Sequence, residues 1–111
     1  MGVFAASSHI TTAVMLIGGR GWLAGPSSLI PSQSVKLYDL CKAGDWSTAM
    51  DLQREIWAVN QVFARFNLAG AVKAGLRLQG FECGDPAPPQ PTLSKAQVAE
   101  VRVVLQKVGA L

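Results

Sequence analysis

Few side chains in this sequence are suited to chemistry, and they form no familiar catalytic or metal-binding motif. His9 is the only histidine, and it follows Ser7 and Ser8 in a short polar stretch. Because an imidazole can carry a proton near neutral pH, His9 is a candidate proton carrier or substrate contact; the alternative is a solvated loop histidine. Cys41 and Cys83 have no CxxC spacing and no histidine beside them, so we predict no metal site and no cofactor. Two unpaired thiols fit a reduced, cytoplasmic setting.

The positive charges are not arranged as a binding surface either. The 111 residues carry a net charge of +3, but no two lysines or arginines are adjacent. Nucleic-acid-binding proteins usually gather their basic residues on one face or along a helix. The scattered pattern is typical of a solvated surface, and we expect no nucleic-acid partner.

The composition favours more burial than a small free-standing domain requires. Half of the residues are hydrophobic and only 15% are charged. Small domains have proportionally more surface to cover with polar groups, so the excess predicts apolar surface that meets a partner or the rest of a larger fold. The apolar stretch over 3–17 is interrupted by serine, histidine and threonine and lacks a positive leading region. It is also shorter than the roughly 20 residues of a membrane span, so we expect neither a signal peptide nor a membrane helix.

The first 30 residues predict a compressed βαβ unit. The pattern indicates a buried parallel strand over 3–6, a loop over 7–9, a brief helix over 11–17, a glycine-rich turn and a second strand over 22–24. Strands this short are not stable as an isolated parallel sheet, because both faces of such a sheet must be covered. The pattern therefore predicts neighbouring strands that these residues do not supply.

Residues 31–66 predict two helices. Pro31 suits a first helical turn, and Gly44 suits the position just after a helix end. Asp45 or Ser47 can cap the next helix. Its apolar residues alternate steps of three and four as far as Phe66, which predicts one continuous helix over about five turns.

Two further helices flank a proline-rich loop. A shorter helix is predicted over 69–78, ending before Gly80, and the prolines of 86–91 favour an extended, semi-rigid chain. Ser94 and Gln97 have the spacing of a capping box and predict the start of the last helix, which ends at Gly109.

The order of these elements and several short segments resemble the dihydrodipicolinate synthase and N-acetylneuraminate lyase family of pyruvate-type class I aldolases. Residues 18–25 (GGRGWLAG) are similar to the family's Gly-x-x-Gly-x-Ile-Ser segment on the eighth barrel strand. Residues 42–45 (KAGD), with the following Ala49 and Leu52, resemble the entry into its ninth helix. Residues 71–74 (AVKA) resemble a Val-Lys-Ala helix start, and 88–94 resemble the loop before its last helix. The arginine usual in that loop is absent, and Gly84 and Asp85 stand nearby.

This resemblance implies an α/β fold and a reaction class. Residues 1–30 would form the last two βα units of a (β/α)8 TIM barrel, and residues 31–111 its final helix and a C-terminal helical subdomain. The family's enzymes are lyases that form a Schiff base between a strand lysine and pyruvate or a related 2-keto acid, with a tyrosine relaying protons. Such a lysine must be neutral to attack, which requires partial desolvation. Tyr38 and all five lysines fall in predicted helices, and a complete barrel takes about 250 residues. We therefore expect a C-terminal portion that is inactive alone.

The resemblance also implies substrate-binding positions, because TIM-barrel active sites lie at the C-terminal ends of the strands. Leu23 matches a hydrophobic residue whose backbone carbonyl approaches the keto acid, although an ordinary barrel-core leucine would look the same. Gly25 stands where sialic-acid-cleaving members carry a serine, which argues against that substrate. Ser7 and Ser8 replace the family's acidic pair, which favours a substrate other than that of lysine biosynthesis. His9 adjoins them.

Two interpretations of the whole chain remain open. In the family, three extra helices beside the barrel help to build a homo-oligomer, commonly a tetramer, and Trp46 and Trp57 suit such contacts or packing within the chain. The alternative is a small, non-catalytic helical interaction or oligomerisation module, or a gene remnant. A lysine-bearing strand encoded upstream of Met1 would favour the first, and a compact, cooperatively melting monomer the second.

Overall fold

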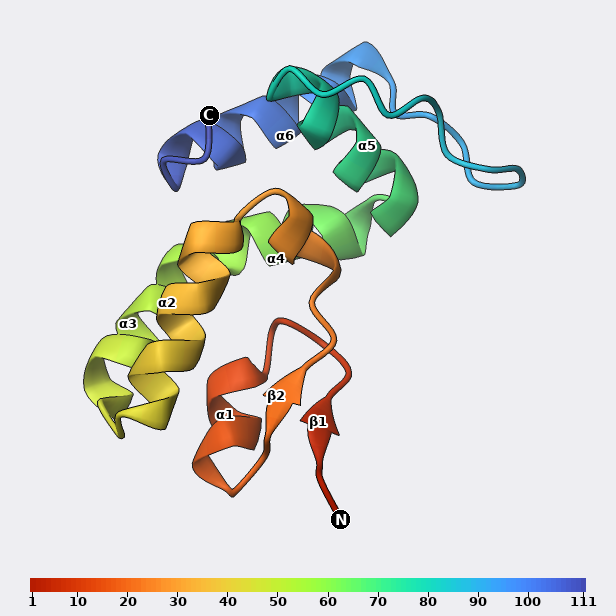
Figure 1. The fold of residues 1–111 in the computed structure, drawn as a ribbon. Helices are drawn as coiled ribbons and strands as arrows, with labels where there is room; N and C mark the ends of the chain where they lie inside the picture. The colour runs from red at the N-terminus through yellow and green to blue at the C-terminus, as the bar shows by residue number, and fades with distance from the viewer. The chain divides into compact units, whose positions relative to one another are not determined.

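The computed structural model describes all 111 residues, which fall into two compact units, Met1–Trp57 and Ala58–Leu111. The N-terminal unit contains, in order, β1 (Phe4–Ala5), α1 (Thr11–Leu16), β2 (Gly21–Trp22), the 3-10 turn η1 (Gly25–Ser28), α2 (Pro31–Lys42) and α3 (Trp46–Glu55) (Figure 1). The unit boundary falls at the start of α4 (Trp57–Arg65). The C-terminal unit continues with α5 (Leu68–Leu78) and α6 (Lys95–Lys107). None of these helices has the length and apolar content needed to cross a bilayer.

The βαβ prediction is confirmed, with both strands shorter than predicted. β1 and β2 pair in parallel, with Phe4 opposite Gly21 and Ala5 opposite Trp22. A backbone hydrogen bond extends the pairing beyond Trp22, since Leu23 N donates to the Ala5 carbonyl over 2.9 Å. The second strand begins one residue earlier than predicted, at Gly21, and includes neither Leu23 nor Ala24. That residue already belongs to the following turn, because its carbonyl accepts the Ser27 hydroxyl at 2.6 Å.

The glycine run before β2 forms a tight helix-to-strand turn, as its sequence predicts. Gly18 has a φ of +102°, a conformation that side chains disfavour. Gly19 N donates to the Val14 carbonyl over 2.8 Å, which draws the turn back onto α1. A β-carbon on Gly19 would lie 2.5 Å from Val14 Cγ1, so the approach of the two segments requires glycine.

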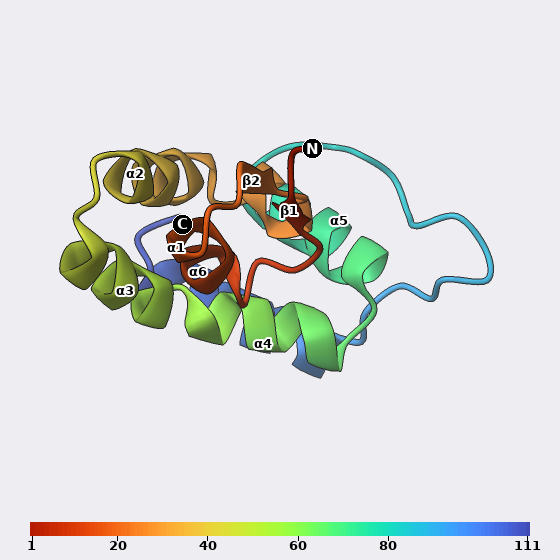
Figure 2. The ribbon, with the colours of Figure 1, turned by 90° about the horizontal axis from the view of Figure 1, so that it is seen from below.

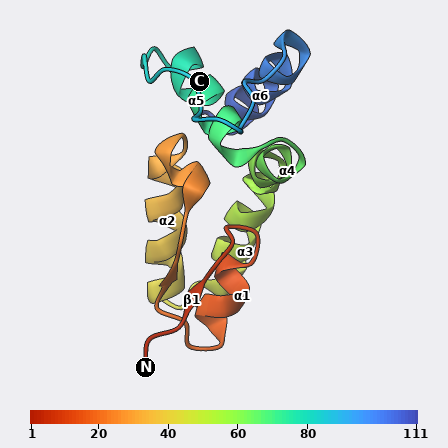
Figure 3. The ribbon, with the colours of Figure 1, turned by 90° about the vertical axis from the view of Figure 1, so that its right-hand side faces the viewer.

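The helices of the N-terminal unit pack on one another and on the sheet. α1 contacts β1 and β2 as well as α2 and α3, and α2 lies alongside α3 (Figure 3). Asp45, and not Ser47, is the N-cap of α3, because its carboxylate accepts the Thr48 N–H at 3.3 Å. The core of this unit includes the buried side chains of Met15, Leu29, Ile30, Leu37, Cys41, Ala49 and Leu52.

The prediction of one continuous helix to Phe66 is wrong. α3 ends at Glu55 and α4 begins at Trp57, with Ile56 between them at φ −85° and ψ 0°. β-Branched and aromatic side chains lower helix propensity, and Ile56, Trp57 and Val59 cluster at the break. The apolar spacing continues across it, so periodicity alone does not reveal the change in backbone.

The C-terminal unit pairs α5 with α6 across a long loop. Asn67 caps α5 by accepting the Gly70 N–H at 2.6 Å, and α5 packs against α6. The predicted capping box is present: Gln97 N donates to Ser94 Oγ, and Ser94 N donates to Gln97 Oε1. Between the helices, the predicted proline-rich segment forms an open arc without regular secondary structure (Figure 2).

Removing the capping box should measurably weaken the C-terminal unit. We expect Ser94→Ala to lower the free energy of unfolding by about 1 kcal/mol, because the Gln97 N–H loses its acceptor. Urea unfolding followed by circular dichroism measures the change. The matched control is Ser47→Ala at an exposed position of α3 that is not a cap, where less than about 0.5 kcal/mol is expected. Equal losses for the two variants would contradict the capping role.

Candidate functional site

The loops that follow the two strands emerge at the same edge of the sheet. β1 and β2 are parallel, and Figure 1 shows both arrows running in the same direction. The loop after β1 carries Ser7, Ser8 and His9, and the segment after β2 carries Leu23 and Gly25. The structure thus places all five residues predicted to bind substrate after the C-terminal ends of paired strands, while their roles remain predictions.

Ser7 shapes the loop after β1 around His9. Its hydroxyl oxygen accepts the His9 backbone N–H at 3.2 Å and lies 3.2 Å from His9 Nδ1. When the neutral ring carries its proton on Nε2, the Ser7 hydroxyl donates to Nδ1. Nδ1 is therefore occupied inside the loop, and Nε2 is the nitrogen left for a substrate.

The His9 ring also packs against an aromatic side chain at the first residue of α4. The His9 and Trp57 ring centroids lie 4.9 Å apart with an angle of 85° between the planes, an edge-to-face arrangement. Contacts of Trp57 between subunits or within the chain are predicted from the sequence. Within the N-terminal unit the structure gives it a contact with His9, which limits rotation of the imidazole.

A buried glutamine on α3 forms hydrogen bonds with the same loop and with the start of α1. Gln53 Nε2 donates to the Ser8 carbonyl over 2.9 Å. Its Oε1 accepts both the backbone N–H and the hydroxyl of Thr12, at 3.3 and 3.2 Å. Gln53 is 4% exposed and Thr12 1%. The one sequence signal for this contact is the position of Gln53, a polar residue directly after Leu52 of the apolar stripe.

The segment after β2 is less covered. The Leu23 side chain is 72% exposed, so nothing in this chain buries it as a barrel core would. Its backbone is nevertheless fixed by the bond from Leu23 N to the Ala5 carbonyl. Gly25 begins η1 and is exposed. This side of the edge offers backbone groups and apolar surface rather than charged side chains.

The residues that could form a covalent intermediate lie on helices and not in the two loops at this edge. Every lysine is helical: Lys36 and Lys42 on α2, Lys73 on α5, Lys95 and Lys107 on α6. Tyr38 is on α2, where its ring lies 6.5 Å from that of Trp22. Burial raises the pKa of the Cys41 thiol, an effect that its hydrogen bond with Thr12 partly opposes. A thiol held in its neutral form is a poor nucleophile.

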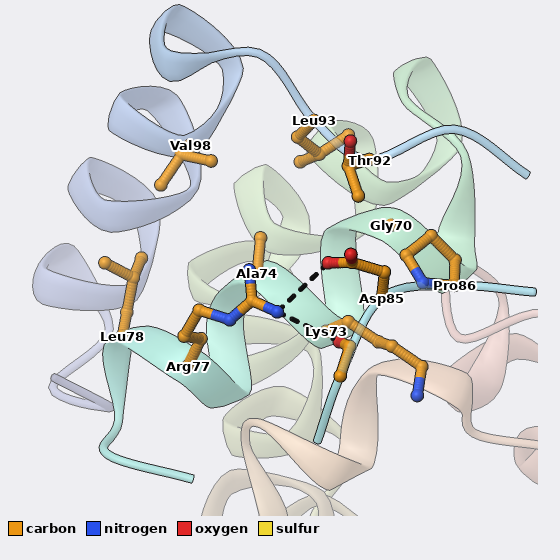
Figure 4. A pocket seen from close by; sticks show the side chains of 11 residues that line it. Gly70, Lys73, Ala74, Arg77, Leu78, Asp85, Pro86, Thr92, Leu93 and Val98 are labelled. Atoms are coloured by element: carbon orange, nitrogen blue, oxygen red, sulfur yellow. Dashed lines mark hydrogen bonds and ion pairs between the residues drawn. The ribbon is translucent and has the colours of Figure 1, made fainter. Parts of the chain in front are cut away.

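The C-terminal unit contains a cavity of about 130 Å³ between α5, the loop after it and the start of α6 (Figure 4). Its cationic side chains are already bound to that loop. Arg77 Nη2 donates to the Gly84 carbonyl and to Asp85 Oδ1, each over 3.1 Å, and this pairing raises the pKa of Arg77. Lys73 Nζ donates to the Cys83 carbonyl over 2.8 Å. The arrangement fastens the loop to α5, and we assign no ligand to it.

Comparison with known proteins agrees with this architecture. The profile of the Dihydrodipicolinate synthetase family matches residues 1–108. The 4-hydroxy-tetrahydrodipicolinate synthase of Corynebacterium diphtheriae is 28% identical over 95 residues, which are 86% of this chain and 32% of that protein. Dihydrodipicolinate synthase from Thermotoga maritima superposes with a TM-score of 0.93 at 24% identity, over 99% of this chain and 37% of that one.

A third likeness is to the chloride-inhibited dihydrodipicolinate synthase of Acinetobacter baumannii, solved in complex with pyruvate. It superposes with a TM-score of 0.92 at 19% identity, over 100% of this chain and 38% of that one. This chain spans about a third of the length of the curated relatives it matches. With its two parallel strands and following helices, it belongs to the dihydrodipicolinate synthetase family and corresponds to the C-terminal part of that family's TIM barrel.

Proposed function

We propose that this chain is the C-terminal portion of a Schiff-base lyase or aldolase that acts on pyruvate or a related 2-keto acid, and that it is inactive alone. Residues 1–30 supply the last two βα units of the barrel, and residues 31–111 supply its final helix and a helical subdomain. The observation that carries this proposal is the shared edge of β1 and β2 in a chain of this family, because TIM-barrel chemistry takes place at that edge.

The uncovered sheet supports a requirement for further barrel strands. Phe4 is 59% exposed although it lies on a strand, and Leu23 beyond the other strand is 72% exposed. An apolar cavity of about 350 Å³ beside β2 is lined by Trp22, Val35 and Tyr38 among others. Parallel sheets are normally buried on both faces. Adjacent strands of a barrel would cover these surfaces. They would also supply the Schiff-base lysine and the proton-relaying tyrosine.

The five edge residues then take the following roles. The Leu23 carbonyl approaches the bound keto acid, and His9 Nε2 exchanges a proton with the substrate or binds it. Ser7 and Ser8 offer neutral hydroxyl groups where the family has a pair of carboxylates, so the substrate does not need a positively charged group here. Gly25 has no side chain to bind a sugar hydroxyl. The pyruvate complex of the Acinetobacter baumannii enzyme supports a keto-acid substrate.

The proposal extends to assembly and location. A homo-oligomer formed through the C-terminal helices is supported by exposed apolar side chains on them, such as Leu68 on α5, which is 48% exposed. Two free cysteines suit the reducing cytoplasm. The dispersed basic residues support neither a nucleic-acid partner nor a membrane partner.

Borohydride trapping with pyruvate tests the proposal. We expect no reduced pyruvate adduct on the 111-residue chain by mass spectrometry, because all five of its lysines lie on helices. When the chain replaces the matching C-terminal part of the Corynebacterium diphtheriae synthase, we expect trapping on a lysine of the preceding barrel strands. Samples that contain pyruvate but no borohydride control for non-specific adducts.

Two results would overturn this interpretation. An adduct on one of the chain's own lysines would show that it does not lack the nucleophile. A chain that melts cooperatively as a compact monomer, and that abolishes trapping when placed in the hybrid, would instead favour the small helical interaction module.

A further inference from the structure

We propose that Gln53 is a positioning residue for the candidate site. It fixes the backbone of the loop after β1, and through that loop it sets where the His9 ring stands at the edge of the sheet. The catalytic meaning of this role rests on the proposed function, whereas the positioning itself is a property of the N-terminal unit and is testable without activity.

Both ends of the Gln53 amide are used across a long sequence separation. Nε2 donates to the Ser8 carbonyl, 45 residues away, and Oε1 accepts the N–H and the hydroxyl of Thr12, 41 residues away. Ser8 is in the loop and Thr12 is in the first turn of α1. One buried side chain therefore joins the loop after β1, the first turn of α1 and the last turn of α3.

The chemistry of this junction selects a primary amide. The Ser8 carbonyl needs a donor, and the Thr12 N–H needs an acceptor, because buried backbone groups are costly to leave without partners. Glutamine carries an NH₂ donor and a carbonyl acceptor side by side on one neutral group, and asparagine carries the same group on a side chain one methylene shorter. An ionised glutamate would keep the acceptor for Thr12 and lose the donor for Ser8. A methionine of similar size would lose both.

The carbonyl that Gln53 binds belongs to Ser8, the residue between Ser7 and His9. On one side of Ser8, the Ser7 hydroxyl engages the His9 N–H and Nδ1; on the other, the His9 ring packs edge-on against Trp57. Gln53 and Trp57 are four residues apart, so the same stretch of chain fixes the loop's backbone and its imidazole. Freeing the Ser8 carbonyl should let the loop move and break the ring contact.

Nuclear magnetic resonance of the full 111-residue chain tests this inference without reference to activity. In the wild type, we expect slow exchange of the Gln53 side-chain amide protons and a nuclear Overhauser effect between the His9 and Trp57 rings. In Gln53→Met, we expect the Thr12 amide to exchange about tenfold faster or more. We also expect the nuclear Overhauser effect between the two rings (the ring effect) to disappear. Amides of α5 and α6 should keep their protection, which verifies that the remainder is folded.

Gln53→Glu separates positioning from general stability. With the glutamate ionised, we expect Thr12 protection to stay within about threefold and the nuclear Overhauser effect between the His9 and Trp57 rings still to disappear, because only the bond to Ser8 is removed. Gln53→Asn should restore part of the ring effect. The matched control is Gln61→Glu, the same substitution at an exposed position of α4, which should change neither readout.

Three results would overturn the inference: fast exchange of the Gln53 amide protons in the wild type, a ring effect that persists in both Gln53→Met and Gln53→Glu, or one that Gln61→Glu also abolishes. The first needs no variant, so it holds even if a substitution prevents folding. Should the ring effect depend on Gln53 while the hybrid enzyme traps no pyruvate, the positioning stands and the proposed function alone fails.

Discussion

Replacing Leu105 with alanine is expected to lower the stability of the C-terminal unit by about 2–5 kcal/mol. Leu105 has no exposed surface, and it lies on α6, which packs against α5. Truncating it removes buried methyl and methylene groups and leaves a cavity that packed helices close only in part. A unit of this size has little stability to spare, so a loss of this magnitude would leave much of it unfolded. Urea unfolding followed by circular dichroism would show the shift.

The same helix provides the control for Leu105. Val103 is two residues earlier on α6 and is 62% exposed. Val103→Ala should change the free energy of unfolding by less than about 0.5 kcal/mol, since it removes atoms that already contact water. If the two alanine variants unfolded at the same urea concentration, the buried position of Leu105 would be contradicted.

The second large effect is expected in the βαβ unit, from Gly19→Ala. The added β-carbon would lie 2.5 Å from Val14 Cγ1 and 2.7 Å from the Val14 carbonyl oxygen. The side chain of Val14 can rotate, but its carbonyl cannot easily withdraw, because it accepts the Gly19 N–H that closes the turn. We expect a cost of about 1–3 kcal/mol. Faster hydrogen exchange at the paired amides of Arg20 and Leu23 would report the loss of strand pairing.

Gly2→Ala is the control for this turn. A β-carbon on Gly2 would meet Arg20 Cγ at 3.5 Å, an ordinary contact distance. It should leave the exchange of both strand amides unchanged. Similar acceleration in the two variants would mean that any added methyl group near the sheet is disruptive, and the specific role of the Val14 carbonyl would be wrong.

Much of the fold could be predicted because its boundaries depend on local chemistry. A capping box at Ser94 and Gln97, a cap at Asp45 and a left-handed Gly44 each act within a few residues, so the sequence pattern is sufficient. The break at Ile56 could not be predicted in this way. Both helices keep the apolar stripe, and the stripe does not record the interruption of the helix at Ile56.

For the candidate site, the sequence predicts which residues take part but not which side chains contact them. The order of short strands and glycine-rich turns indicated that the loops at Ser7 and Leu23 share an edge, and the parallel pairing agrees. The partners of those loops could not be inferred. Gln53 and Trp57 reach the loop from more than 40 positions away, and no periodicity links a glutamine amide to a particular carbonyl.

The attachment of the loop between α5 and α6 at both of its ends has a practical consequence for protein engineering. Arg77 holds Gly84 and Asp85 at one end, and the Asn67 amide donates to the Pro91 carbonyl at the other, over 3.0 Å. The exposed middle of the loop, residues 87–90, carries neither anchor. An epitope tag or a fluorophore attachment sequence inserted there would lengthen a span whose endpoints stay fixed, which makes this the preferred insertion point for labelling the chain.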